Sequence, residues 1–148
     1  MKKKISFMAV IIILFISLVT YFKTLSLSKI ATKDNQLKMV FCEYSVKNGN
    51  PFIDSISYQT ITSEQKDAVL TVLKDYPYRR TLGTLFSDGS ISDFGSKLLY
   101  IYVYDGASQV DCIAASSAGT ITLHGKNYHM ENAEQFIEQI LEIIEHAD

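Results

Sequence analysis

The chain has 148 residues, with 14 Lys and Arg against 16 Asp and Glu. Four of the basic residues, Lys2, Lys3, Lys4 and Lys23, flank one apolar run near the N-terminus, whereas every acidic residue comes after that run. The remainder of the chain is therefore acidic, with a net charge of minus six before histidine. This charge argues against nucleic acid as a partner.

The apolar run from Ile5 to Phe22 contains no charged residue. Its 18 residues would reach ~27 Å as a helix, close to the ~30 Å hydrocarbon core of a bilayer. We therefore expect a transmembrane anchor, and the preceding lysines favour a cytoplasmic N-terminus with the rest of the chain outside. A cleaved signal peptide has the same layout, with a small-x-small exit at Ser26-Leu27-Ser28, but usually a shorter apolar core, so we favour an uncleaved anchor. A cleaved chain would be secreted.

These features divide the chain into three parts. Residues 1–22 hold the cytoplasmic lysines and the anchor, and residues 23–36 are expected to form a polar linker. Residues 37–148 then form one exported domain of about 110 residues, which is enough to bury its own core.

Two strands are predicted at the start of the exported domain. Apolar and polar residues alternate from Lys38 to Val46, as a strand with two different faces requires. The turn-forming sequence Asn48-Gly49-Asn50-Pro51 ends this strand. A second strand is expected from Ile56 to Ile61.

A helix should follow, because Thr62 and Gln65 have the spacing of a capping box. Pro77 would end it. Tyr78 to Leu85 reads as a third strand, and Ser87 to Ser96 has the composition of a surface loop. The apolar residues of the helix recur at helical spacing, at Val69, Val72, Leu73 and Tyr76.

Lys97 to Tyr104 is the strongest predicted strand, since β-branched and aromatic residues dominate it with regular alternation. Asp105-Gly106 supplies a tight turn, so the chain should return through Gln109 to Ala115 as an antiparallel neighbour. Two shorter strands are expected at Thr120 to Leu123 and at Lys126 to Met130.

The last helix should open at Asn132, with Gln135 three residues later. One wide apolar face runs along it, formed by Ala133, Phe136, Ile137, Ile140, Ile143 and Ile144. The order of elements predicts an α+β fold: an N-terminal transmembrane helix, then a mostly antiparallel sheet with two helices packed on one face.

The layout from Ile56 to Ile144, with the stretches LLYIYVYDG and GKNYHM, resembles small membrane-anchored exported domains of unknown function from Gram-positive bacteria. The resemblance implies an anchored, non-enzymatic module. It carries no catalytic signature, and no functional residue is transferred from it.

Cys42 and Cys112 are the only cysteines, and both fall in predicted strands. Export would allow a disulfide between them to persist. The alternative is two separate buried thiols that act as small apolar side chains, which we slightly favour. A redox enzyme is not indicated, because the chain has no C-x-x-C sequence.

His124 and His129 flank Gly125, so a hairpin turn could bring two imidazoles to one end. An envelope hydrolase or a metal-dependent enzyme built on these histidines is the competing function. A zinc site would need a third ligand, with Glu131 the nearest, and no metal-binding motif is present. No metal or other cofactor is therefore expected.

Two surfaces could serve in binding. Five glutamates fall on one side of the last helix, opposite its apolar face, at Glu131, Glu134, Glu138, Glu142 and Glu145. A solvated face is the simpler reading of this stripe, with a basic partner or repulsion from anionic lipid as the functional one. On the strongest strand, Tyr100, Tyr102 and Tyr104 share one side, which would face outward if the aliphatic side faces the helices. Tyrosine also packs well within sheets, so the row could be purely structural.

Together these features predict a membrane-anchored extracytoplasmic domain that binds a partner rather than catalysing a reaction. The membrane contact is Ile5–Phe22. The other partner would be a protein, peptide or glycan at the cell surface.

Overall fold

The computed structural model describes residues 2–87, 89, 91 and 97–145, with side chains described from Met8 onward except at residue 51. Its elements confirm an α+β fold with a mostly antiparallel sheet. The helices are α1 (Lys2–Tyr21), the 3₁₀ helix η1 (Leu27–Lys29), α2 (Ser63–Asp75), α3 (Leu82–Leu85) and α4 (Ala133–Glu145). The strands are β1 (Leu25–Ser26), β2 (Gln36–Lys47), β3 (Asn50–Thr60), β4 (Pro77–Tyr78), β5 (Lys97–Asp105), β6 (Ser108–Ser116), β7 (Thr120–Leu123) and β8 (Lys126–His129).

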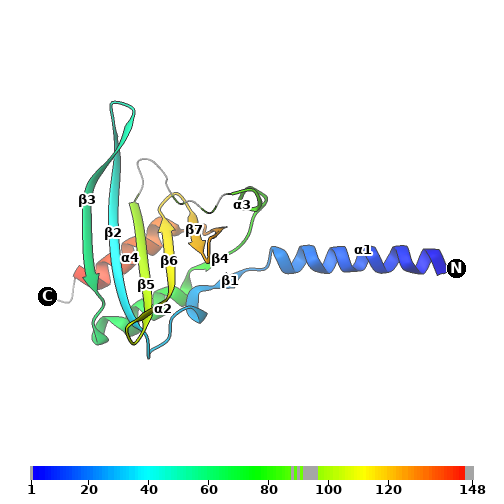
Figure 1. The fold of residues 1–148 in the computed structure, drawn as a ribbon, viewed down its shortest axis with the longest axis horizontal. Coiled ribbons are helices and arrows are strands. Elements are labelled where there is room, and N and C mark those ends of the chain that lie inside the picture. The colour runs from blue at the N-terminus through cyan, green and yellow to red at the C-terminus, as the bar shows by residue number, and fades with distance from the viewer. Residues whose placement is uncertain (1, 88, 90, 92–96, 146–148) are drawn as a thin grey trace.

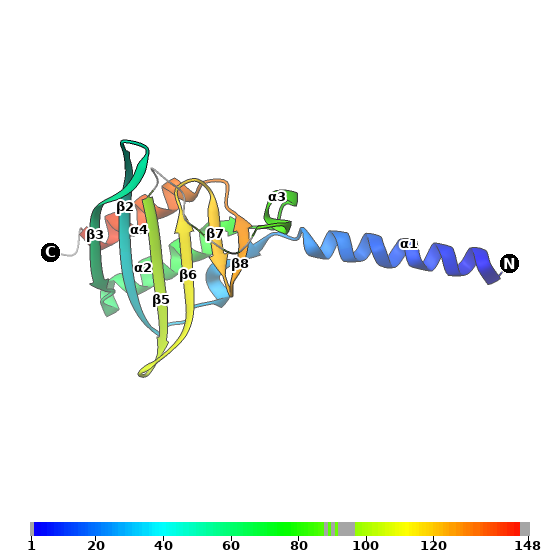
Figure 2. The ribbon, with the colours of Figure 1, turned by 45° about the horizontal axis from the view of Figure 1, so that its top comes forward.

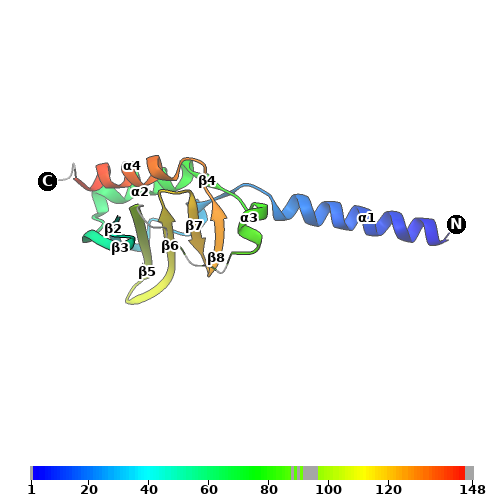
Figure 3. The ribbon, with the colours of Figure 1, turned by 90° about the horizontal axis from the view of Figure 1, so that it is seen from above.

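Six of these strands form one antiparallel sheet in the order β3-β2-β5-β6-β7-β8. Strands β2 and β3 form a hairpin, and β5, β6, β7 and β8 follow one another in both the chain and the sheet. The connection from β3 to β5, which contains α2, crosses over β2 and places β5 on its other side. Helices α2 and α4 lie on one face of the sheet, as the edge-on view shows (Figure 3). The two-helix layer predicted from sequence is therefore confirmed.

The alternation of β5 divides the two faces of the sheet. Leu99, Ile101 and Val103 are fully buried beneath the helices, whereas the tyrosines between them are only half-buried. The apolar face of α4 meets this aliphatic layer, with Phe136, Ile137 and Ile140 wholly inaccessible to solvent. The core is thus made by one strand face and one helix face that sequence periodicity had already identified.

Helix α2 begins and ends where its sequence signals place the boundaries. The Thr62 side chain accepts a hydrogen bond from the Gln65 backbone N–H, and the Gln65 side chain accepts one from the Thr62 N–H. The helix stops at Asp75, two residues before Pro77. Gln65 has a second role, because its Nε2 donates to the Ile144 carbonyl oxygen at 3.3 Å and so joins α2 to the end of α4.

Two tight turns shape the sheet. Gly106 has φ +57°, and the Asp105-Gly106 turn joins β5 to β6 as expected. Asn48 and Gly49 have φ +54° and +78°, the left-handed region that asparagine and glycine tolerate. They connect β2 directly to β3, which therefore begins at Asn50 rather than near Ile56. The predicted strand break is in fact the tip of a long hairpin.

Two expectations from sequence were wrong. Tyr78–Leu85 is not a strand: Pro77 and Tyr78 pair with β1, Arg79 makes an isolated bridge to His129, and the chain then forms the single turn α3, capped by Thr81. Residues 23–36, expected to be a linker, are part of the fold, since Leu27 is fully buried in the core. Most of the expected loop at 87–96 lies outside the described residues.

Helix α1 extends from the domain on the side opposite the C-terminus (Figure 1). Its large apolar side chains from Met8 to Val19 lie in solvent, in contrast to those of α2 and α4. Within the part of the chain described with side chains, no helix meets the length and hydropathy required to cross a membrane.

Ile140→Ala should lower the free energy of unfolding of the full chain by roughly 2 to 5 kcal/mol, because Ile140 is fully buried and the substitution leaves a cavity. Denaturant unfolding in detergent solution, followed by circular dichroism, measures the change. Gln139→Ala, an exposed position on the same helix, is the control and should change stability by less than about 0.5 kcal/mol. Equal effects of the two substitutions would remove α4 from the core.

Candidate functional site: the uncovered face of the sheet

The face of the sheet turned away from α2 and α4 carries four tyrosines on β3 and β5. Tyr100, Tyr102 and Tyr104 alternate along β5, and Tyr58 lies on β3 in register with Tyr100, with Val40 of β2 between them. Tyr58 is 71% exposed, and the rings of Tyr100 and Tyr102 are stacked with centroids 6.4 Å apart. We call these four residues the tyrosine face. Figure 2 shows the sheet broadside, with the helices behind it.

Two hollows lie on either side of Tyr102. One, of about 370 Å³, is bounded by Tyr100 and Tyr102 and by Asp111, Cys112 and His124 toward the β7–β8 turn. The other, of about 350 Å³, lies between the Tyr102 ring and the edge strand, and is lined by Tyr58, Tyr104 and Lys38 among others.

Lys38 and the tyrosines bring polar groups to this face. The Lys38 ammonium nitrogen lies 4.7 Å from the centroid of the Tyr104 ring, which is a cation–π distance. Tyrosine phenols are protonated at neutral pH, and burial raises the pKa of Tyr100 and Tyr102 further, so both can donate as well as accept hydrogen bonds.

Cys42 and Cys112 lie on the same face but cannot pair in this sheet. Cys42 on β2 is opposite Leu98 of β5, whereas Cys112 on β6 is opposite Tyr102. Strand β5 therefore separates them, and they are offset by four residues, or ~13 Å along the strands. A disulfide needs Cα atoms within about 7 Å. Both cysteines are free thiols, so the candidate disulfide is not formed.

Asp111 and His124 form a polar pair beside Cys112. The His124 Nε2 lies 2.8 Å from Asp111 Oδ2, and Asp111 Oδ1 accepts a hydrogen bond from the Cys112 backbone N–H at 2.8 Å. The arrangement resembles the parts of a cysteine nucleophile, but its electrostatics oppose that role. Burial, and then the negative charge of Asp111, raise the pKa of the Cys112 thiol to about 11. A protonated thiol is a poor nucleophile.

The two histidines of the expected enzyme site are not brought together. His124 is in the turn after β7 with φ +50°, while His129 ends β8 and pairs with Thr120 at the far end of that hairpin. The length of β8, about 10 Å, separates them. Among the described residues no group of three potential metal ligands occurs. The expectation that the Gly125 turn gathers both imidazoles was therefore wrong.

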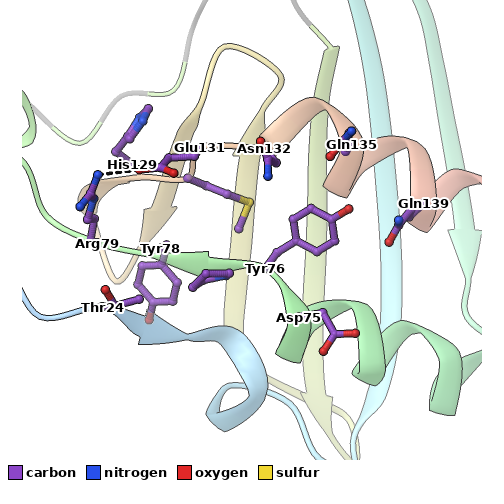
Figure 4. Close-up of a pocket in the computed structure, with 12 residues that line it drawn as sticks. Thr24, Asp75, Tyr76, Tyr78, Arg79, His129, Glu131, Asn132, Gln135 and Gln139 are labelled. Atoms are coloured by element: carbon purple, nitrogen blue, oxygen red, sulfur yellow. Dashed lines mark hydrogen bonds and ion pairs between the residues drawn. The ribbon is translucent and has the colours of Figure 1, made fainter.

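A hollow of about 560 Å³, larger than the two beside Tyr102, lies elsewhere, where the end of α2, β4 and the start of α4 meet (Figure 4). Its lining includes His129 and the polar side chains of Thr24, Asp75, Asn132, Gln135 and Gln139. Two of its lining residues form an ion pair, in which Arg79 Nη2 lies 2.6 Å from Glu131 Oε1. This hollow is therefore a mainly polar cavity with one ion pair among its lining residues.

The glutamates of α4 are also not as isolated as sequence suggested. Lys97 on β5 lies 3.0 Å from Glu138 and 3.6 Å from Glu134, measured from Nζ to a carboxylate oxygen, and Arg79 meets Glu131. The hydrogen bond to Glu138 is the main reason that the pKa of Lys97 is raised. The stripe is thus partly neutralised by residues distant in sequence.

No protein-family model matches the chain, and neither a curated protein nor a solved structure is significantly similar to it. The site is therefore argued from geometry. Tyr100, Tyr102 and Tyr104 were found from their alternation, whereas Tyr58, Lys38 and the Asp111–His124 pair were missed. They join the site only through strand pairing.

The high pKa of Cys112 has a direct chemical consequence. In a Cys42→Ala variant, alkylation of Cys112 by iodoacetamide at pH 8 should be about 100-fold slower in the folded chain than in urea, because a pKa near 11 rather than 9 lowers the thiolate fraction by that factor. Mass spectrometry of the alkylated protein follows the rate. A folded rate equal to the unfolded one would show that the thiol is not shielded.

Proposed function

We propose that the protein is a single-pass, membrane-anchored binding domain on the outside of the cell, and that the tyrosine face contacts its partner. The observation that carries the proposal is a sheet face, turned away from α2 and α4, with four tyrosines and a hollow on each side of Tyr102. Tyrosine combines a rigid apolar ring with a polar tip, which suits a contact surface.

The anchor in this proposal is the run from Ile5 to Phe22, which begins ahead of the first described side chain. Support comes from its length, its lack of charge and the three lysines that precede it. The solvent exposure of the apolar side chains of α1 from Met8 to Val19 is further support, because no described part of the domain covers them.

The partner class follows from the shape and chemistry of the face. Two shallow, open hollows beside a flat aromatic strip suit an extended ligand better than a small enclosed molecule. A peptide, a glycan or a loop of another envelope protein fits this description. The neutral phenols, Lys38 and Asp111 supply donors and acceptors along it.

The competing proposal, an envelope hydrolase or metal enzyme at His124 and His129, has weaker support. The two histidines line different hollows, and the one thiol beside a histidine has a raised pKa. A catalytic group usually needs a pKa shifted toward its task.

Membrane topology is the first part to test. Protease added to intact spheroplasts should digest the chain beyond Asp34 and leave a membrane-embedded N-terminal fragment. Immunoblotting with separate N- and C-terminal tags measures both products, and a cytoplasmic protein serves as the protected control. Survival of the domain until the membrane is broken would contradict the orientation.

Partner contact is the second part. A Tyr100→Thr/Tyr102→Thr double variant keeps strand propensity but removes two rings of the tyrosine face. We expect it to lose crosslinked partner in pull-downs from intact cells while the thermal unfolding midpoint falls by only a few degrees.

Phe52→Thr is the matched control, since Phe52 is an exposed aromatic residue on β3 outside both hollows. It should recover partner at the wild-type level. Partner recovery unchanged in the double variant, with stability lost, would mean that the tyrosines are structural.

A further inference from the structure

The short segment from Leu82 to Phe86 exposes three large apolar side chains together. Leu82 is 71%, Leu85 45% and Phe86 87% exposed, and α3 itself buries no residue. A single helical turn capped by Thr81 and Thr84 holds this segment in place. Its apolar side chains are therefore presented to the outside by an ordered element.

This segment lies beside the C-terminal end of α1, as two views of the ribbon agree (Figure 2, Figure 3). The Arg80 guanidinium carbon, two residues before α3, is 4.6 Å from the centroid of the Tyr21 ring at the end of α1. Tyr21 and Leu85 also line one hollow of about 190 Å³, together with Lys126. The exposed apolar segment and the end of the helix thus share one small region of the surface.

We propose that Leu82, Leu85 and Phe86 insert into the outer surface of the same bilayer that holds α1, so that α3 is a second, interfacial membrane contact of the domain. The inference rests on the anchor in the proposed function and extends it. Tyrosine is enriched at the boundary between lipid and water, so Tyr21 marks the level of the headgroups. The α3 segment lies at that level, and its side chains meet lipid without any movement of the domain.

The charges around the segment fit lipid rather than a protein as the occupant. Arg80 and Lys126 line the hollow between Tyr21 and Leu85, and no acidic side chain among the described residues lines it. Cations beside apolar side chains match the phosphate and acyl layers of a membrane surface.

The chain contains no tryptophan, which allows a direct test. Three variants, Phe86→Trp, Phe52→Trp and Phe15→Trp, each place one tryptophan at an exposed phenylalanine: in the proposed contact, at β3 near the hairpin tip, and in α1. Each full-length variant is reconstituted in phosphatidylcholine vesicles, with and without lipids brominated near the headgroup end of the acyl chains. Fluorescence emission and its quenching are measured.

We expect blue-shifted emission and quenching by brominated lipid for Phe86→Trp and Phe15→Trp, and neither for Phe52→Trp. Quenching of Phe15→Trp without quenching of Phe86→Trp would overturn the α3 contact and leave the anchor intact. Quenching of neither would overturn both. Blue-shifted emission of Phe86→Trp that brominated lipid does not quench would mean that protein covers the segment, and would also overturn the proposal.

Discussion

The strict alternation of β5 is the constraint on which the rest of the structure depends. The strand lies between β2 and β6, so both of its faces are in the interior of the sheet rather than at an edge. Its aliphatic residues can be buried only if a layer covers that face, and the apolar sides of α2 and α4 supply it. A shift of register by one residue would place tyrosines beneath the helices and aliphatic side chains in water, which makes the observed register strongly preferred.

The alternation of β5 also sets the geometry and the chemistry of the tyrosine face. Tyr100 and Tyr102 are held at fixed spacing by the strand and are flanked by short residues of β6, Cys112 and Ala114, which leave a hollow beside the rings. The same partial burial raises the pKa of the two phenols and of the Cys112 thiol, because a charged form would be poorly solvated there. The face is therefore mostly aromatic, with Lys38 and Asp111 at its margins, and this is the chemistry on which the proposed contact depends.

The direction of α1 relative to the sheet gives the proposed membrane arrangement its geometry. Helix α1 leaves the domain on the side of β8, and β3 lies at the opposite side of the sheet (Figure 2). With α1 in a bilayer, Tyr58 on β3 stands far from the lipid and the α3 segment stands close to it. Contact through α3 would limit rotation of the domain about its anchor, and so hold the tyrosine face at a steady angle to the membrane.

Local sequence determined the elements whose causes are local. The capping pair Thr62 and Gln65, the Asp105-Gly106 turn, the alternation of β5 and the apolar side of α4 act within a few residues, so periodicity and spacing are enough to find them. Tertiary structure alone decided the order of the strands, and with it that Cys42 and Cys112 are kept apart and that Tyr58 joins Tyr100. It also decided that Leu27 enters the core, that Lys97 meets the glutamates of α4, and that Leu82 to Phe86 lies beside Tyr21. These outcomes depend on which distant segments share surface on folding, and no pattern of neighbouring residues records that choice.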